Sequence, residues 1–258
     1  LQKIDVNGER QWGDGIQVDP SDGVNFGGRF SADNNGGVNV FWEWGVYPNI
    51  DILFQSFNDL GAAALDEPIF ISDAPGYQFA PNTISSNAGG VYAIFADQGS
   101  GSIDLRVQYL DGVTPTFAGG GSLALDGMDG NVKYNHAFRS GDHQILLMWE
   151  DNRSTKKIYG NWLADDMLEA ANGIQVSFSD NSSTETDLSQ PKMLKAETGI
   201  YLATFDAVES PKRIRINRLS DELSNVWDSA GVALNPVFDQ RSDTLTSVEN
   251  GIGCFWSE

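Results

Sequence analysis

The chain begins with Leu1-Gln2-Lys3-Ile4-Asp5-Val6-Asn7-Gly8 and, after three further residues, continues with Trp12-Gly13-Asp14-Gly15-Ile16-Gln17-Val18. This pattern predicts a strand, a turn and a second strand. The same outline recurs in residues 54–71, 107–125, 160–176 and 216–234. Each copy has a side-chain amide at the same place: Gln2, Gln55, Gln108, Asn161 and Asn217. The amides are 53, 53, 53 and 56 residues apart, and a period of this size indicates propeller blades, solenoid turns or arrays.

A second repeat consists of short apolar runs. They are Val38–Trp42, Val91–Phe95, Ile145–Trp149, Ile200–Thr204 and Ile252–Trp256. Their first residues are 53, 54, 55 and 52 residues apart, which agrees with the first period. Because these runs are apolar on both alternating faces, each predicts a strand that is covered by a neighbouring sheet on either side.

The two repeats together predict four strands in each copy. We call them first (26–32 type), second (38–42 type), third (52–57 type) and fourth (69–71 type). Their connections are short and rich in Gly, Asn, Asp and Pro, as antiparallel hairpins require. The predicted fold is therefore all-β: a single five-bladed β-propeller domain over residues 1–258, with four-stranded antiparallel blades.

The chain starts with a third strand and stops just after a second strand. The fifth blade is complete only if Leu1–Val18 pairs with Gln240–Trp256, so we expect the N-terminal strands to close the ring by pairing with the C-terminal strands. The alternative is that the chain is one module of a longer array or of a larger ring.

The composition excludes several classes of function. A formal net charge of −20 repels nucleic acid and anionic lipid, so neither is an expected partner. No apolar run approaches the ~18 residues of a membrane helix, so membrane insertion is not expected. The single cysteine, Cys254, excludes an internal disulfide. Acidity, scarce cysteine and abundant Asn, Asp, Gly and Ser favour a secreted bacterial domain, extracellular or at the cell surface.

The first copy has an amide, an aliphatic residue, an Asn-Gly turn, then Trp12 and Gly-Ile-Gln-Val. This order resembles the propeller repeats of large secreted surface proteins of Bacteroidota and other environmental bacteria, and the resemblance spans the whole chain. It implies an extracellular module, such as an adhesin or part of a type IX secretion cargo, with the secretion machinery as a possible partner. It assigns no catalytic residue.

Acidic residues follow the second and fourth strands and are expected on one face of the disc. They are Asp19, Asp22, Glu43, Asp73, Asp97, Asp126, Asp129, Glu150, Asp151, Asp180, Asp187, Asp206 and Glu258. One interpretation is that each caps a turn and remains solvated. The other is a calcium site, because calcium binds six to eight oxygen ligands. The candidate ligands for calcium, the only cofactor considered, are Asp126, Asp129, Asp180 and Asp187.

Two aromatic residues, Trp44 and Tyr47, lie in the loop after the first of the apolar runs. Beside carboxylates they are a candidate sugar-stacking platform, since aromatic rings cover the apolar faces of sugars. Packing against the next blade is the alternative interpretation.

The first strands are expected to line the central funnel. They place Arg29, Arg139 and Lys192 there with one carboxylate, Asp243, so the funnel is a candidate site for an anion. Some five-bladed propellers are glycosidases, which need two facing carboxyl groups. A funnel with one carboxylate favours a different role.

The near-equal repeats indicate a structural rather than a catalytic role, because an active site breaks symmetry at a few positions. The sequence therefore favours a non-enzymatic extracellular module for binding or display, with a glycan or a protein of the cell surface or matrix as partner. The alternative is a carbohydrate-active, glycosidase-like propeller enzyme.

Overall fold

The computed structural model describes residues 1–20, 23–72, 74–86, 89–99, 101–117, 120–125, 132–140, 144–151, 157–164, 167–168, 173–176, 188–206, 213–227, 231–234, 241–249 and 251–257. The chain divides into two compact units. Unit 1 comprises Leu1–Gly101 and Leu105–Ala124, and unit 2 comprises Ser102–Asp104 and Leu125–Glu258. Each unit is described by itself below.

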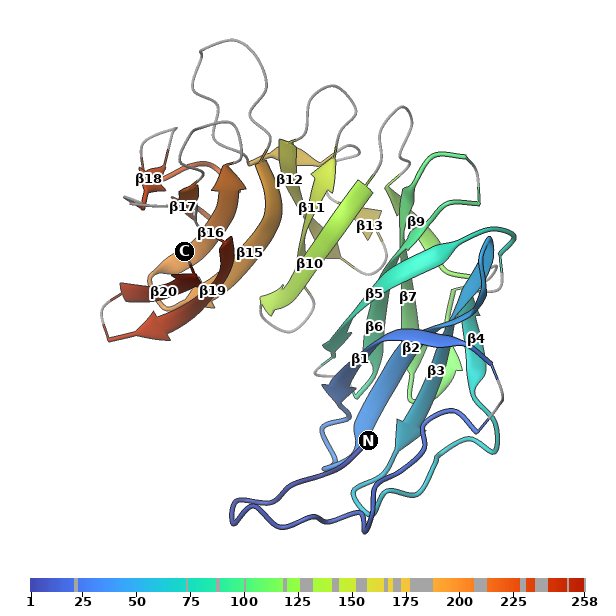
Figure 1. Ribbon diagram of the computed structural model, residues 1–258. Helices are drawn as coiled ribbons and strands as arrows, with labels where there is room; N and C mark the ends of the chain where they lie inside the picture. Colours follow the sequence, from blue (N-terminus) through green and yellow to red (C-terminus); the bar gives the residue numbers. More distant parts are fainter. Residues whose placement is uncertain are drawn as a thin grey trace. The chain divides into compact units, whose positions relative to one another are not determined.

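The regular structure that is described is entirely β, as predicted, and the strands of unit 1 form two antiparallel sheets (Figure 1). The first sheet contains β1 (Asn25–Ala32), β2 (Val38–Val46), β3 (Asn49–Phe57) and β4 (Ile69–Ser72), in chain order. The second contains β5 (Gln78–Ser85), β6 (Val91–Asp97), β7 (Asp104–Asp111) and β8 (Thr114–Pro115), with β9 (Ser122–Leu125) also paired to β7. No helix long and apolar enough to span a membrane occurs in the part of the chain that is described.

Unit 2 continues the same plan with two further sheets and one pair of strands. The third sheet contains β10 (Val132–Ser140), β11 (Gln144–Asp151), β12 (Lys157–Ala164) and β13 (Met167–Leu168), with β14 (Ile174–Gln175) on β12. The fourth contains β15 (Leu188–Ala196), β16 (Gly199–Asp206), β17 (Arg213–Leu219) and β18 (Val232–Ala233). The last two strands, β19 (Arg241–Val248) and β20 (Gly251–Ser257), pair with each other.

The repeated amide joins the third strand to the chain that follows it. In the second sheet, the Gln108 side-chain nitrogen donates to the Phe117 carbonyl at 2.8 Å, and the Gln108 side-chain oxygen accepts the Phe117 N–H at 2.9 Å. Gln55 makes the same two bonds with Leu65. The amide thereby replaces backbone pairing where the fourth strand is too short to provide it. This role explains why the sequence repeats an amide at this position.

Four of the five apolar second strands are buried on both faces, as predicted, whereas Phe255 of β20 is 64% exposed. In β2, Phe41 packs with Phe54 of β3 and Phe95 of β6, whereas Val40 and Trp42 belong to a cluster on the opposite face. In unit 2, Leu146 and Met148 of β11 share a core with residues of the fourth sheet. Burial of these side chains, each worth about 1.5–3 kcal/mol, stabilises the stacking of neighbouring sheets.

The five first strands share a β-bulge at the same place. In β1 the register shifts between Phe26 and Arg29, so one extra residue stands opposite β2. Equivalent shifts occur in β5 between Phe79 and Asn82, in β10 between Lys133 and His136, in β15 between Ser189 and Lys192, and in β19 between Arg241 and Thr244. Bulges of this kind bend a strand and redirect its side chains, and they are frequent beside active sites.

The N-terminal segment differs from its prediction. Leu1–Val18 contains one isolated bridge, Ile4 with Arg10, in place of two regular strands. Leu1, Ile16 and Val18 nevertheless pack on the Val40 face of the first sheet, and the Trp12 indole donates to the Asp59 carbonyl at 3.0 Å. The predicted closed ring of five four-stranded blades is not present in the described structure, which contains open sheets and the two-stranded pair β19–β20.

Candidate active site

The sequence-predicted aromatic residues have different surroundings in unit 1. Trp44 is half-buried and lies edge-on to Phe70, with 5.8 Å between ring centroids. Tyr47, in the turn between β2 and β3, is 74% exposed and lies edge-on to Tyr77 at 6.0 Å. Tyr47 therefore presents a ring to a ligand, whereas part of the Trp44 ring is used in packing.

The residues that the sequence places in the funnel all belong to first strands. Arg29 is exposed in β1, Arg139 is exposed in β10 and Lys192 is half-buried in β15. Asp243 belongs to β19, at its bulge. Arg29 and Lys192 both resume the strand pairing after a bulge, so they hold equivalent positions in their sheets.

The sequence-predicted calcium ligands Asp126, Asp129, Asp180 and Asp187 lie outside the described residues. Among the residues that are described, no group of three or more His, Cys, Asp or Glu side chains could hold a metal ion.

Glu43 of β2 is a partly buried carboxyl group in unit 1. Its carboxyl oxygen Oε1 accepts a 2.8 Å hydrogen bond from the backbone N–H of Ala80, in the bulge of β5. Burial raises the pKa of the Glu43 carboxyl, while the Ala80 hydrogen bond and the positive charge of Arg29 oppose the rise. A carboxyl group with a raised pKa retains its proton to higher pH, which suits a general acid.

The backbone of β1 and β5 lies close to the Glu43 carboxyl. Gly27, in the bulge of β1, has φ of +43°, and a Cβ added there would lie 3.2 Å from Glu43 Oε1. Ala80 also has a positive φ, of +52°, which is uncommon for a residue other than glycine. Such conformations occur often at functional sites. The two bulges thus bring β1 and β5 against one carboxyl group.

Gly27 also lines a pocket of about 410 Å³. The walls of this pocket include Asp19, Phe26, Gly27 and Trp42. Asp19 is 9% exposed, so it is a buried carboxyl group rather than a solvated turn residue. The bulge of β1 thus contributes to the pocket that contains Asp19 and also lies close to the Glu43 carboxyl.

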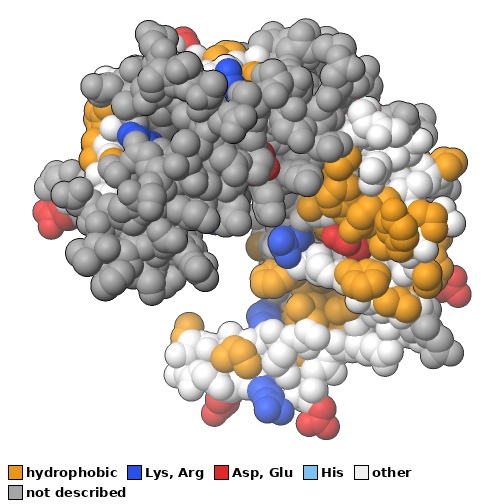
Figure 2. All heavy atoms as spheres, turned by 45° about the horizontal axis from the view of Figure 1, so that its top comes forward, with side chains coloured by type: hydrophobic (Ala, Val, Ile, Leu, Met, Phe, Trp, Pro, Cys, Tyr) orange, Lys and Arg blue, Asp and Glu red, His pale blue; other side chains and the backbone are white. Residues whose placement is uncertain are grey.

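Aromatic rings adjoin this site in unit 1. Tyr77 stacks on Phe79 with 4.5 Å between centroids and 24° between ring planes. The ring of Tyr47 lies edge-on to that of Tyr77. Burial raises the pKa of Tyr77, and the nearby Glu43 charge raises it further. Figure 2 shows hydrophobic side chains gathered over part of the described surface, with acidic and basic side chains among them. This combination of rings and carboxyl groups can bind a sugar.

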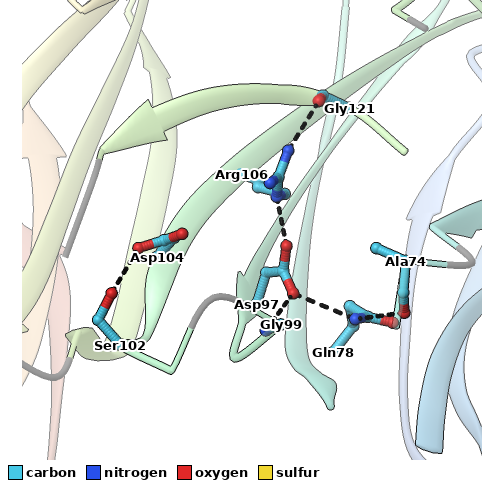
Figure 3. A network of polar contacts seen from close by, with 8 residues as sticks. All are labelled: Ala74, Gln78, Asp97, Gly99, Ser102, Asp104, Arg106 and Gly121. Atoms are coloured by element: carbon cyan, nitrogen blue, oxygen red, sulfur yellow. Dashed lines mark hydrogen bonds and ion pairs between the residues drawn. The ribbon is translucent and has the colours of Figure 1, made fainter. Parts of the chain in front are cut away.

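A buried ion pair supports the start of β5 (Figure 3). Asp97, only 2% exposed, pairs with Arg106 and accepts hydrogen bonds from the Gln78 side chain at 3.1 Å and from the Gly99 N–H at 2.9 Å. Gln78 directly precedes Phe79 and Ala80. Because both Asp97 oxygens are used in this network, we assign Asp97 a structural role in holding β5 in place.

Sequence reasoning placed Asp19 and Glu43 among the acidic rim but did not single out either. The signal it lacked was the bulge, which turns β1 and β5 toward these carboxyl groups. Tyr77 and Phe79 were also missed, because they come from the next sheet and follow Glu43 by more than thirty residues. The carboxyl groups thus come from β2 and from the segment before β1, not from the first strands on which the sequence argument relied.

Comparisons with known proteins give a likeness of fold. No protein-family model matches the sequence, and no curated protein matches it either. A solved structure of a thermostable family-43 glycoside hydrolase is similar over 93% of this chain and 84% of the other, with a TM-score of 0.51 at 12% identity. At this identity the likeness establishes the fold alone, which in these neighbours is the five-bladed propeller.

Two further solved structures are more distant. An endo-arabinase from Bacteroides thetaiotaomicron is similar over 71% of each chain, with a TM-score of 0.46 at 10% identity. The catalytic domain of an α-L-arabinofuranosidase of family GH62 from Coprinopsis cinerea is similar over 92% of this chain and 81% of the other, with a TM-score of 0.47 at 12% identity.

These findings correct the functional prediction. The sequence favoured a non-enzymatic module for binding or display, but the structural neighbours are glycoside hydrolases and favour the enzyme alternative. The prediction had relied on the near-equal repeats and on the single carboxylate, Asp243, among the first strands. None of the comparisons supports an adhesin or a type IX secretion cargo.

Proposed function

We propose that this protein is a carbohydrate-active enzyme that hydrolyses glycosidic bonds, with Glu43 as the proton donor and Asp19 as the second carboxyl group. The observation that supports this most directly is that two carboxyl groups occur near the bulge of β1: Asp19 lines a pocket of about 410 Å³ together with Gly27, and a Cβ added at Gly27 would lie 3.2 Å from Glu43 Oε1. The propeller-type fold that the chain shares with a family-43 glycoside hydrolase is consistent with it.

The proposed chemistry follows from the two environments. Glu43, whose pKa is raised by burial, donates its proton to the leaving glycosidic oxygen as the bond from that oxygen to the anomeric carbon breaks. Asp19, in the pocket wall, acts on the anomeric carbon as nucleophile or on the attacking water as base. Water supplies the hydroxyl group of the new sugar end, and its remaining proton returns a carboxylate to the acid form.

The test replaces each carboxyl group by its amide. Glu43→Gln and Asp19→Asn keep the shape of the side chain but remove the ionisable group, so we expect each to lower kcat by about 10²–10⁴-fold on any glycan that the parent protein cleaves. The substrates are aryl glycosides and neutral polysaccharides, and hydrolysis is measured by the release of reducing ends. Glu67→Gln, at an exposed position, is the matched control and should keep the parent rate.

The parent protein must first release products from at least one substrate of the panel. Absence of turnover on a broad glycan panel overturns the proposal. Normal turnover by Glu43→Gln removes the assignment of the proton donor, and normal turnover by Asp19→Asn removes that of its partner.

Location outside the cell remains a hypothesis that rests on composition and on the resemblance to secreted surface proteins. Immunodetection in the culture medium and in washed cells of the source organism tests it, and a signal confined to the cell lysate would contradict it. Export through a type IX system is a narrower hypothesis, which loss of the medium signal in a strain lacking that system would support.

A further inference from the structure

Tyr47, Tyr77 and Phe79 form a continuous set of rings, which we call the aromatic platform. Tyr47 lies in the turn between β2 and β3 of the first sheet, and Phe79 lies in β5 of the second sheet. Tyr77, just before β5, forms a parallel bridge with Ile50 of β3. The backbone N–H of Ile50 also donates to the Gly76 carbonyl at 3.2 Å. These backbone contacts hold the platform across two neighbouring sheets.

The rings of the platform are accessible and closely spaced. Tyr47 is 74% exposed, while Tyr77 and Phe79 are each half-buried and stack at 4.5 Å. A hydrophobic core would bury such rings, whereas a binding surface leaves their faces or edges open to solvent. The platform therefore has the composition of a binding surface that is already ordered without a ligand.

The platform adjoins the candidate active site. Phe79 directly precedes Ala80, whose N–H binds the Glu43 carboxyl at 2.8 Å. The negative charge of Glu43 also contributes to the raised pKa of Tyr77, as expected of groups that lie close together. The rings and the Glu43 carboxyl therefore belong to one part of unit 1.

The chemistry of the surroundings favours a sugar chain over a protein segment. Stacked rings cover the apolar C–H faces of sugars, and the adjacent Arg29, Glu43 and tyrosine hydroxyl groups offer hydrogen bonds to sugar hydroxyls. The net charge of −20 disfavours an anionic polymer, so an uncharged chain is the better fit.

We infer that the aromatic platform binds a neutral polysaccharide chain, whose sugar units stack on Tyr47, Tyr77 and Phe79 while another unit reaches the Glu43 carboxyl. This inference rests on the proposed function, because it assigns a substrate class to the same site. It predicts that the protein acts on polymers and long oligosaccharides in preference to single sugar units.

Binding is measured apart from catalysis. Glu43→Gln is used as the background so that polymer is not consumed, and retention is measured by affinity electrophoresis in gels that contain debranched arabinan, arabinoxylan, β-glucan or polygalacturonate. Tyr47→Ala, Tyr77→Ala and Tyr77→Phe are compared in this background. Trp227→Ala is the control, because Trp227 is an aromatic residue of unit 2 that is 38% exposed.

We expect retention by at least one neutral polymer and none by polygalacturonate. Tyr47→Ala and Tyr77→Ala should each weaken retention by about 3- to 10-fold, whereas Tyr77→Phe, which keeps the ring, and Trp227→Ala should not. In the parent protein, which keeps Glu43, the same alanine substitutions should raise KM. The increase should be larger for the polymer than for an aryl glycoside. Tyr47→Ala keeps the test informative if Tyr77→Ala does not fold, since Tyr47 is largely solvent-exposed.

The outcomes separate the two proposals. No retention on any neutral polymer, or retention unchanged by both alanine substitutions, overturns the platform even if Glu43→Gln abolishes hydrolysis. Retention that depends on the rings while no variant or parent hydrolyses any glycan supports the platform and overturns the proposed function. Equal retention on polygalacturonate would contradict the assignment to neutral chains.

Discussion

Opposing effects act on the pKa of the Glu43 carboxyl. Burial raises its pKa above the ordinary value of 4.5, and the Ala80 N–H and the Arg29 charge pull it down. Because the folded-state pKa is raised, folding favours the protonated form. The contribution of this group to stability is therefore complete below the unfolded-state pKa and is lost as the pH rises through the folded-state pKa.

This environment predicts a pH-dependent effect of Glu43→Gln on stability. The amide has no charge to bury and can still accept the Ala80 hydrogen bond, so the variant should be more stable than the parent at pH 7.5 and nearly equal to it at pH 3.5. Urea unfolding at both pH values measures the difference. A variant that is less stable than the parent at pH 7.5 would mean that ionised Glu43 stabilises the fold.

At the residue scale, sequence reasoning selected two residues that the structure places near Glu43, and their roles stay a prediction. Tyr47 and Arg29 were selected by their residue type and their place in the repeat, and the structure places both beside Glu43 or its aromatic neighbours. The burial of Asp19 could not be read from the sequence, because Asp19-Pro20 has the composition of an ordinary turn. Burial there depends on packing against residues that follow in β1 and β2.

The element that most clearly repeats is the third strand with its buried amide. Gln108 is 1% exposed, and its side chain satisfies both the N–H and the carbonyl of Phe117. Removing the amide leaves these backbone groups without that partner in a partly buried site, so we expect Gln108→Ala to lower the free energy of unfolding by about 1–3 kcal/mol.

Chemical denaturation followed by tryptophan fluorescence measures this effect. Gln11→Ala is the matched control, because Gln11 is exposed, and it should change the free energy of unfolding by about 0.5 kcal/mol or less. Equal, small effects of the two substitutions would show that the repeated amide is not a structural requirement.

Elements with strong periodic signals were predicted well. Four of the five apolar runs are strands buried on both faces, and four of the five amides, Gln55, Gln108, Asn161 and Asn217, lie on third strands, because hydrophobic spacing and a recurring polar residue are both visible in one dimension. The bulges were not predicted. Their extra residues have no shared identity, from Gly27-Gly28 in β1 to Ala80-Pro81 in β5, so no pattern in the sequence marks them.

At the scale of the whole molecule, the net charge of −20 is the dominant electrostatic property. Repulsion among like charges destabilises a compact chain, and salt screens it. We expect Tm at pH 7.5 to rise by about 2–4 °C, corresponding to about 1 kcal/mol, between 10 and 300 mM NaCl.

The control for this prediction is the same salt series close to the calculated isoelectric point of 4.2, where the net charge vanishes and the rise should disappear. A rise of equal size at both pH values would indicate a general effect of salt on hydrophobic burial.

The ring as a whole was only partly predictable. Repeat period and strand count indicated propeller blades, and a solved propeller structure is similar in fold. Closure depends on pairing between the two ends of the chain, which periodicity does not report. That all 258 residues form one domain stays a prediction, beside the two compact units that the structure contains.

The recurring bulge has a consequence for how this scaffold can change. The extra residues make no regular ladder pairing, and the five pairs are Gly-Gly, Ala-Pro, Tyr-Asn, Gln-Pro and Ser-Asp. Two pairs are nevertheless constrained, because Gly27 and Ala80 have positive φ and both lie against the Glu43 carboxyl. Ladder pairing does not constrain the pairs of β10, β15 and β19, so substitutions that diversify the chain without loss of sheet pairing are expected first at these three bulges.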